Sequence, residues 1–126
     1  GMRIQYLTIG SGTTYINNPI TYADDLVFLS SDDDGNRWQM TATYGELHPG
    51  IKELRLFKGV AIDLLGGEGN MTTPRIRLLL GENRAVTNAK VRLATANSTT
   101  TATGLNIDLT SSEARLLKEV ETRYAN

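Results

Sequence analysis

The feature that most restricts the fold of this chain is an alternation of apolar and polar residues. Between Arg37 and Tyr44, the residues Trp38, Met40, Ala42 and Tyr44 are separated by single polar residues. Successive side chains of a β-strand point to opposite faces, so this pattern predicts a strand with one buried face. Trp38 and Met40 are therefore expected in the core.

The same alternation recurs along most of the sequence. Strands are predicted for residues 3–9, 26–30, 54–64, 75–80, 89–93 and 105–109. Lys58 and Gly59 interrupt the longest of these segments, which predicts a bulge or a bend there. The connections are short and rich in turn-forming residues, and such connections favour antiparallel neighbours over parallel ones.

The last segment, residues 110–125, has a different spacing. Thr110 and Glu113 match a helix capping box. The apolar residues that follow recur at helical intervals and predict a stripe that packs on the sheet: Ala114, Leu117, Val120 and Tyr124. The predicted fold is mainly β (α+β), an antiparallel β-meander or sandwich of about six to eight strands with one C-terminal α-helix packed on the sheet.

Length and composition indicate a globular protein. The 126 residues are enough for one core, and we predict a single domain spanning residues 2–126, with Gly1 as an expression-tag remnant. No apolar run reaches the ~20 residues of a membrane helix, and cysteine is absent. No secretory pattern follows Met2. These observations predict a cytoplasmic protein without a membrane partner.

One acidic stretch resembles a cation-binding loop. Asp32, Asp34 and Asn36 are candidate calcium ligands around Gly35. An EF-hand loop with Gly35 at its sixth position would need a bidentate glutamate where Thr41 stands. Asp-Gly between two apolar strands is instead typical of a hairpin turn. We therefore predict a turn and no metal site.

Charge is unevenly distributed along the chain. Residues 1–50 carry two bases and six acids, whereas residues 51–92 carry eight bases and four acids. Four of these bases share one face of two neighbouring predicted strands: Arg75, Arg77, Lys90 and Arg92. This basic face is the candidate partner-binding surface, and plain solvated surface is the alternative.

No catalytic residues or cofactor are predicted. His48 is the only histidine, and no serine lies in a nucleophile motif. The preferred function is a non-enzymatic binding or assembly module that associates with itself or with another protein. The first alternative is a nucleic-acid-associated protein that uses the basic face. The second is a small carboxylate-dependent hydrolase, for which Asp63 is the acid most worth inspecting.

Overall fold

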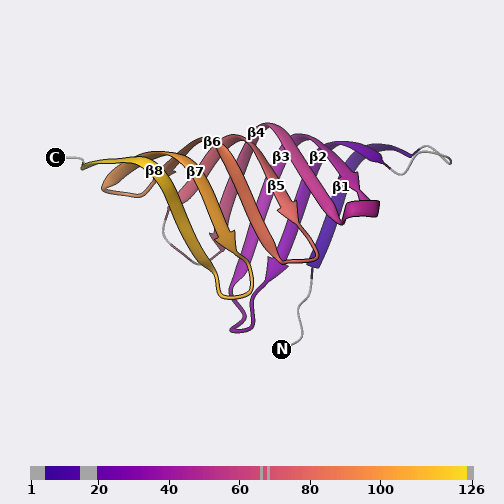
Figure 1. Ribbon diagram of the computed structural model, residues 1–126, viewed down its shortest axis with the longest axis horizontal. Helices are drawn as coiled ribbons and strands as arrows, with labels where there is room; N and C mark the ends of the chain where they lie inside the picture. The colour runs from indigo at the N-terminus through magenta and orange to yellow at the C-terminus, as the bar shows by residue number, and fades with distance from the viewer. Residues whose placement is uncertain (1–4, 15–19, 66, 68, 125–126) are drawn as a thin grey trace.

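The computed structural model describes residues 5–14, 20–65, 67 and 69–124, and these form one antiparallel sheet (Figure 1). Gly1 and Met2 lie outside the described residues, and the single domain stays a prediction. The sheet has eight strands, each paired with the next in sequence. They are β1 (Gln5–Thr14), β2 (Thr21–Ser31), β3 (Arg37–His48), β4 (Glu53–Leu65), β5 (Asn70–Leu79), β6 (Arg84–Ala94), β7 (Ser98–Asp108) and β8 (Glu113–Tyr124).

The meander and the predicted strands are confirmed, except that residues 3 and 4 of the first predicted strand lie outside the described residues. The acidic stretch connects β2 to β3 as a hairpin, and Gly35 takes the positive φ of 87° that the turn requires. A 3₁₀ turn, Pro49–Ile51, connects β3 to β4. In the described part of the chain, no helix is long and apolar enough to cross a membrane.

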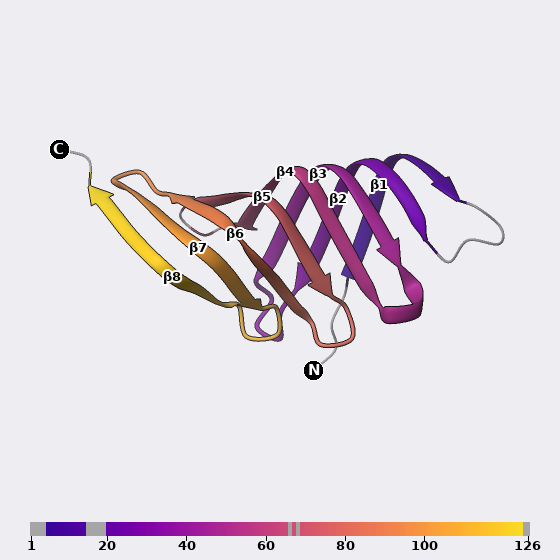
Figure 2. The same cartoon turned by 45° about the horizontal axis from the view of Figure 1, so that its top comes forward.

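The sheet is folded along a ridge that crosses the middle of its strands (Figures 1 and 2). Lys58 and Gly59 both have positive φ, and the pairing register of β4 shifts there against both of its neighbours, which confirms the predicted bulge. Further register shifts interrupt the β5–β6, β6–β7 and β7–β8 pairs. Because a bulge bends its strand, a row of bulges folds the whole sheet.

The ridge divides the sheet into two halves that face each other. We call the half that carries the β2–β3, β4–β5 and β6–β7 turns the first half, and the half that carries the β3–β4, β5–β6 and β7–β8 turns the second half. The inner face is buried although no other layer of secondary structure is described, so each half must cover the other. One core cluster joins residues of both halves, including Trp38 and Met40 of the first and Leu56 and Leu78 of the second. The predicted burial of Trp38 and Met40 is confirmed.

Tyr44 departs from the predicted alternation. It lies on the outer face. Where β3 crosses the ridge, the next residue after Ala42 that faces inward is Gly45, three positions on instead of two. A glycine suits this position, since a Cβ at Gly45 would lie 2.6 Å from a methyl carbon of Leu26 and 3.2 Å from the carbonyl oxygen of Arg55. A two-residue period therefore predicts the face of a residue only up to the first irregularity.

The predicted C-terminal helix is wrong. Residues 113–124 form β8, which pairs with β7 from Asp108 back to Ser98. Thr110 belongs to the β7–β8 turn, where its backbone N–H donates to Asp108 Oδ1 at 2.9 Å. The expected buried stripe is exposed: Leu117, Val120 and Tyr124 are 55%, 53% and 77% exposed.

The apolar residues of β8 lie at helical intervals, although they do not share one face of the strand. Between Lys118 and Glu121 the strand carries one residue more than the facing part of β7, and Glu119 has a positive φ of 55°. Leu117, which completes the helical spacing, lies on the outer face, where it lines a hollow, whereas Leu116 packs against the core. Helix propensities differ by only a few tenths of a kcal/mol per residue, so pairing with the edge of β7 overrides them.

Candidate functional site

The space between the two sheet halves is the first candidate site, because its lining is apolar over several strands. Twelve side chains are almost fully buried there: Leu26, Met40, Leu54, Leu56, Ile62, Ile76, Leu78, Leu105, Ile107, Leu109, Val60 and Val91. Five further apolar side chains pack around them: Leu47, Leu64, Leu80, Leu93 and Leu116. A lining of this kind suits an apolar guest and offers few groups to a polar one.

The two halves are joined opposite the ridge, where the β2–β3 turn meets the β7–β8 turn (Figures 1 and 2). The backbone N–H of Asp33 donates to the carbonyl oxygen of Thr110 at 3.4 Å. Ser112 Oγ accepts a hydrogen bond of 2.8 Å from Trp38 Nε1 and donates one to Asp32 Oδ2. We call these contacts of Asp32, Asp33, Trp38, Thr110 and Ser112 the latch.

Asp32 is the centre of the latch. Its Oδ1 accepts hydrogen bonds from the backbone N–H groups of Asp34 and Asn36 at 2.9 and 2.8 Å. Its Oδ2 accepts one from the Asn36 side-chain amide at 2.9 Å, besides that from Ser112. The bonds from Ser112 and Asn36 lower the pKa of Asp32 from 3.8 to about 2, because they stabilise the charged form.

The candidate calcium ligands are used differently by the structure. Both carboxylate oxygens of Asp32 point at hydrogen-bond donors, Asn36 is one of those donors, and the side chain of Asp34 is exposed. Among the described residues, no three carboxylate or imidazole side chains gather where they could hold a metal ion. The absence of a metal site stays a prediction.

The role of Ser112 could not be found by sequence reasoning. The latch joins residues 74 and 80 positions apart, and no local pattern indicates that they meet. Among the latch residues whose side chains make hydrogen bonds, only Asp32, which is 4% exposed, lies in the acidic stretch that the sequence singled out.

The predicted basic face is divided by the ridge. All four residues are exposed on the outer face, but Arg77 faces Val86 on β6, whereas Arg92 faces Thr72 on β5. Arg75 and Arg77 line one hollow, and Lys90 and Arg92 line another. The structure therefore brings the four cations together in two pairs, and their role in partner binding stays a proposal.

Both ends of the sheet present a strand edge. Among the described residues, β1 is paired only with β2 and β8 only with β7. On β8, Val120, Thr122 and Tyr124 share a face, and Thr122 contacts the buried Thr100 hydroxyl at 2.8 Å. This face continues the inner face of the sheet, but it extends beyond the part that the other half covers.

A folded sheet of this kind, apolar inside and open at both ends, has a counterpart among known proteins. Residues 1–125 match the family described as lipopolysaccharide-assembly, LptC-related. The chain belongs to this LptC-related family. No curated protein sequence matches it.

The crystal structure of LptH from Pseudomonas aeruginosa shares the LptC-related fold of this chain. Its title describes LptH as the LptA homologous periplasmic component of the conserved lipopolysaccharide transport device. The two structures agree with a TM-score of 0.65 and 9% sequence identity, over 98% of this chain and 96% of the other. At this identity the likeness shows the fold alone.

The LptC-related assignment corrects the functional predictions. A cytoplasmic assembly module, a nucleic-acid-associated protein and a carboxylate-dependent hydrolase are all wrong, because the family acts in lipopolysaccharide assembly. Protein partners fit this family, whereas a nucleic-acid partner has no support. The cytoplasmic prediction relied on missing signals, and a lack of cysteine does not distinguish one compartment from another.

Proposed function

We propose that this protein is a periplasmic component of lipopolysaccharide transport that shields the acyl chains of the lipid between its two sheet halves. The observation that carries the proposal is the apolar inner face, which each half buries against the other without another layer. Acyl chains can replace the contacts that one half makes with the other, because dispersion and hydrophobic contacts have no fixed direction.

Entry of a lipid requires the two halves to separate. The interior is filled by the protein's own side chains, several of them with no exposed surface. The two halves remain hinged at the ridge, where the strands are continuous. Opening therefore has to occur at the opposite side, where the latch joins the two turns. The latch is thus the proposed gate to the interior.

A photo-cross-linking amino acid at paired positions tests the proposed function. Leu47 packs against the core, whereas its neighbour Glu46 lies on the outer face. With purified lipopolysaccharide, we expect a cross-linked product from Leu47→Bpa (p-benzoylphenylalanine) and little from Glu46→Bpa. Equal yields at the two positions would mean that the lipid adheres to the surface and does not enter the sheet.

We further propose that the edge of β8 joins the sheet to a neighbouring protein of the same fold. Such pairing satisfies the backbone groups of an edge strand and would cover Val120 and Tyr124. It would also make the two apolar interiors continuous, as transfer of a lipid from one protein to the next requires. A second copy of this chain and a related transport protein are the candidate partners.

Substitution on β8 tests the edge pairing. Val120→Gln removes an exposed apolar side chain from the inner face, and Lys118→Gln is a control two residues away. We expect Val120→Gln to shift the protein towards monomer in light scattering at high concentration, and Lys118→Gln to leave association unchanged. If the unaltered protein is monomeric at all concentrations, a second copy is excluded and the related transport protein is the remaining candidate partner. If that protein does not pair through β8 either, the proposal is refuted.

A further inference from the structure

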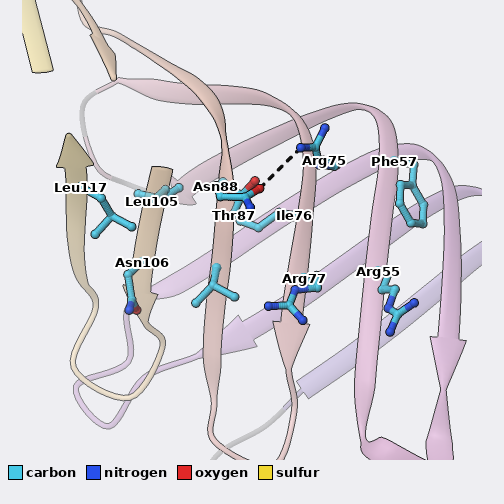
Figure 3. A pocket seen from close by; sticks show the side chains of 11 residues that line it. Arg55, Phe57, Arg75, Ile76, Arg77, Thr87, Asn88, Leu105, Asn106 and Leu117 are labelled. Carbon is cyan, nitrogen blue, oxygen red and sulfur yellow. Dashed lines mark hydrogen bonds between the residues drawn. The ribbon is translucent and has the colours of Figure 1, made fainter. Parts of the chain in front are cut away.

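The outer face of the second half carries a hollow that the proposed function does not use. It has a volume of about 450 Å³, within the range of about 300–1,000 Å³ of small-molecule sites. Its lining comes from β4 to β8 (Figure 3). Val86, one of the residues that line the hollow, is shorter than Arg77, which faces it on β5.

Three arginines give this hollow its chemistry. Arg55 and Arg77 are register partners on β4 and β5, and Arg75 lies two residues from Arg77 on the same face. Two side-chain amides, Asn88 and Asn106, line the side formed by β6 and β7. Guanidinium groups recognise phosphates through paired N–H donors, and amides can bind sugar hydroxyls.

A buried carboxylate holds two of the arginines in place. Glu53 Oε1 accepts hydrogen bonds from Arg55 Nε at 3.2 Å and from Arg77 Nη1 at 3.4 Å. The Glu53 side chain is only 8% exposed, whereas those of Arg55 and Arg77 are 36% and 56% exposed. The lining of the hollow includes three arginines and no acidic residue, so the hollow is positively charged. Because Glu53 holds Arg55 and Arg77 in place, these side chains lose less conformational entropy when an anion binds.

Arg75 completes the arrangement from the ridge side. Its Nη2 donates a hydrogen bond of 3.5 Å to Asn88 Oδ1, which is a neutral partner. Among the ion pairs of the described residues, none includes Arg75. Phe57, beside Arg75, closes the hollow on the β4 side with an apolar ring.

We propose that this hollow is a binding site for a phosphate group carried on a sugar. The proposal deepens the proposed function, on which the choice of a sugar phosphate rests. The phosphate sits between Arg75 and Arg77, with Arg55 beyond them, and the sugar lies over Val86 against the two amides of β6 and β7. The ligand is either the phosphorylated headgroup of a lipid or a soluble sugar phosphate, which share this chemistry.

Titration with glucose 1-phosphate, followed by the shifts of backbone amide signals in NMR spectra, tests the site. We expect binding that shifts signals of β5 and β6 around Arg77 and Val86, and no such shifts with glucose alone. The double variant Arg75→Gln/Arg77→Gln should weaken binding about tenfold or more, because each lost charged hydrogen bond contributes to affinity. No binding of glucose 1-phosphate to the unaltered protein would overturn the proposal.

A matched control separates a site from general attraction between charges. Lys90→Gln/Arg92→Gln removes the same two charges from the same outer face, across the ridge. We expect this variant to bind glucose 1-phosphate with less than about a twofold change, since exposed charges beyond ~10 Å are largely screened. Equal weakening in the two double variants would show a diffuse electrostatic effect and overturn the proposal.

Competition identifies the source of the phosphate. If lipopolysaccharide micelles displace glucose 1-phosphate and micelles of the dephosphorylated lipid do not, the ligand is the lipid headgroup. If neither displaces it, the ligand is a soluble sugar phosphate. Cross-linking from Leu47 reports on the inner face alone, so failure of this site and failure of the proposed function are distinguishable.

Discussion

At the scale of single residues, the latch concentrates several interactions on a few side chains. Ser112 connects Trp38 to Asp32, and both would lose a hydrogen-bond partner if its hydroxyl were removed. Trp38 and Asp32 are 3% and 4% exposed, so water cannot easily replace the lost hydrogen bonds. Such residues contribute to stability mainly through the penalty for leaving a buried polar group unpaired.

Removal of this hydroxyl should therefore destabilise the protein. We expect Ser112→Ala to lower the free energy of unfolding by about 1–3 kcal/mol, measured by urea denaturation. Ser111→Ala, at the exposed neighbouring position, should change it by less than about 0.5 kcal/mol. Similar effects of the two substitutions would show that the latch hydrogen bonds do not persist in solution.

The lowered pKa of Asp32 predicts a pH dependence with a defined sign. Its folded-state pKa of about 2 lies below the ordinary value of 3.8. Its contribution to stability is therefore complete above about pH 4 and is lost as the pH falls towards 2. In urea denaturation at a series of pH values, Asp32→Asn should reduce the acid-induced loss of stability. The exposed Asp33→Asn should leave that loss unchanged, and an identical pH profile for Asp32→Asn and the unaltered protein would contradict the prediction.

At the scale of elements, the strands were predictable from sequence and the last element was not. Residues such as Leu105 and Ile107 alternate with polar neighbours in an uninterrupted strand half, and both are fully buried. In β8 the adjacent Leu116 and Leu117 lie on opposite faces, which hides the alternation, and the residues around the bulge at Glu119 are good helix formers. The strand forms because the edge of β7 is available to pair with it, which no local sequence pattern reveals.

Close packing of β7 against β8 can be tested with two glycines. Gly104 has a φ of 90°, and a Cβ there would lie 3.0 Å from a methyl carbon of Leu117. Gly35 has a similar φ of 87°, but nothing lies within 4 Å of its Cβ position. Both substitutions by alanine incur the cost of the left-handed backbone, about 1–2 kcal/mol.

The steric contact with Leu117 should make Gly104→Ala more destabilising than Gly35→Ala. We expect Gly104→Ala to lower the free energy of unfolding by at least about 1 kcal/mol more than Gly35→Ala does. Thermal or urea denaturation of the two variants measures the difference. Equal costs would show that residues 113–124 do not pack on β7 as described.

At the scale of the whole molecule, the sequence indicates an antiparallel sheet but not how the sheet is folded. The interruption at Lys58 and Gly59 was visible, because a lysine and a glycine break an apolar series. The other irregularities lie at Thr43, near Pro74, at Asn88 and Ala89, and at Glu119, and these residues form no common sequence pattern. The pairing of halves, the latch and the division of the basic face all follow from the fold along the ridge. These three features could not be predicted without knowing that the bulges of neighbouring strands lie side by side along the ridge.

The central claim is that lipid enters between the sheet halves through the latch. The chain contains no cysteine, so a disulfide can be introduced without side reactions. Asp33→Cys/Thr110→Cys would join the two halves where the backbone N–H of Asp33 donates to the carbonyl oxygen of Thr110 at 3.4 Å. Lys52→Cys/Leu80→Cys would join two turns of the second half only, where Leu80 N–H donates to the Lys52 carbonyl oxygen at 2.8 Å.

The decisive measurement is the rate and extent of lipopolysaccharide binding by these variants, oxidised and then reduced. We predict that the oxidised Asp33→Cys/Thr110→Cys protein does not bind the lipid and that reduction restores binding. The oxidised Lys52→Cys/Leu80→Cys protein should bind as the unaltered protein does. Binding at the unaltered rate and extent with the latch locked would contradict entry between the two sheet halves.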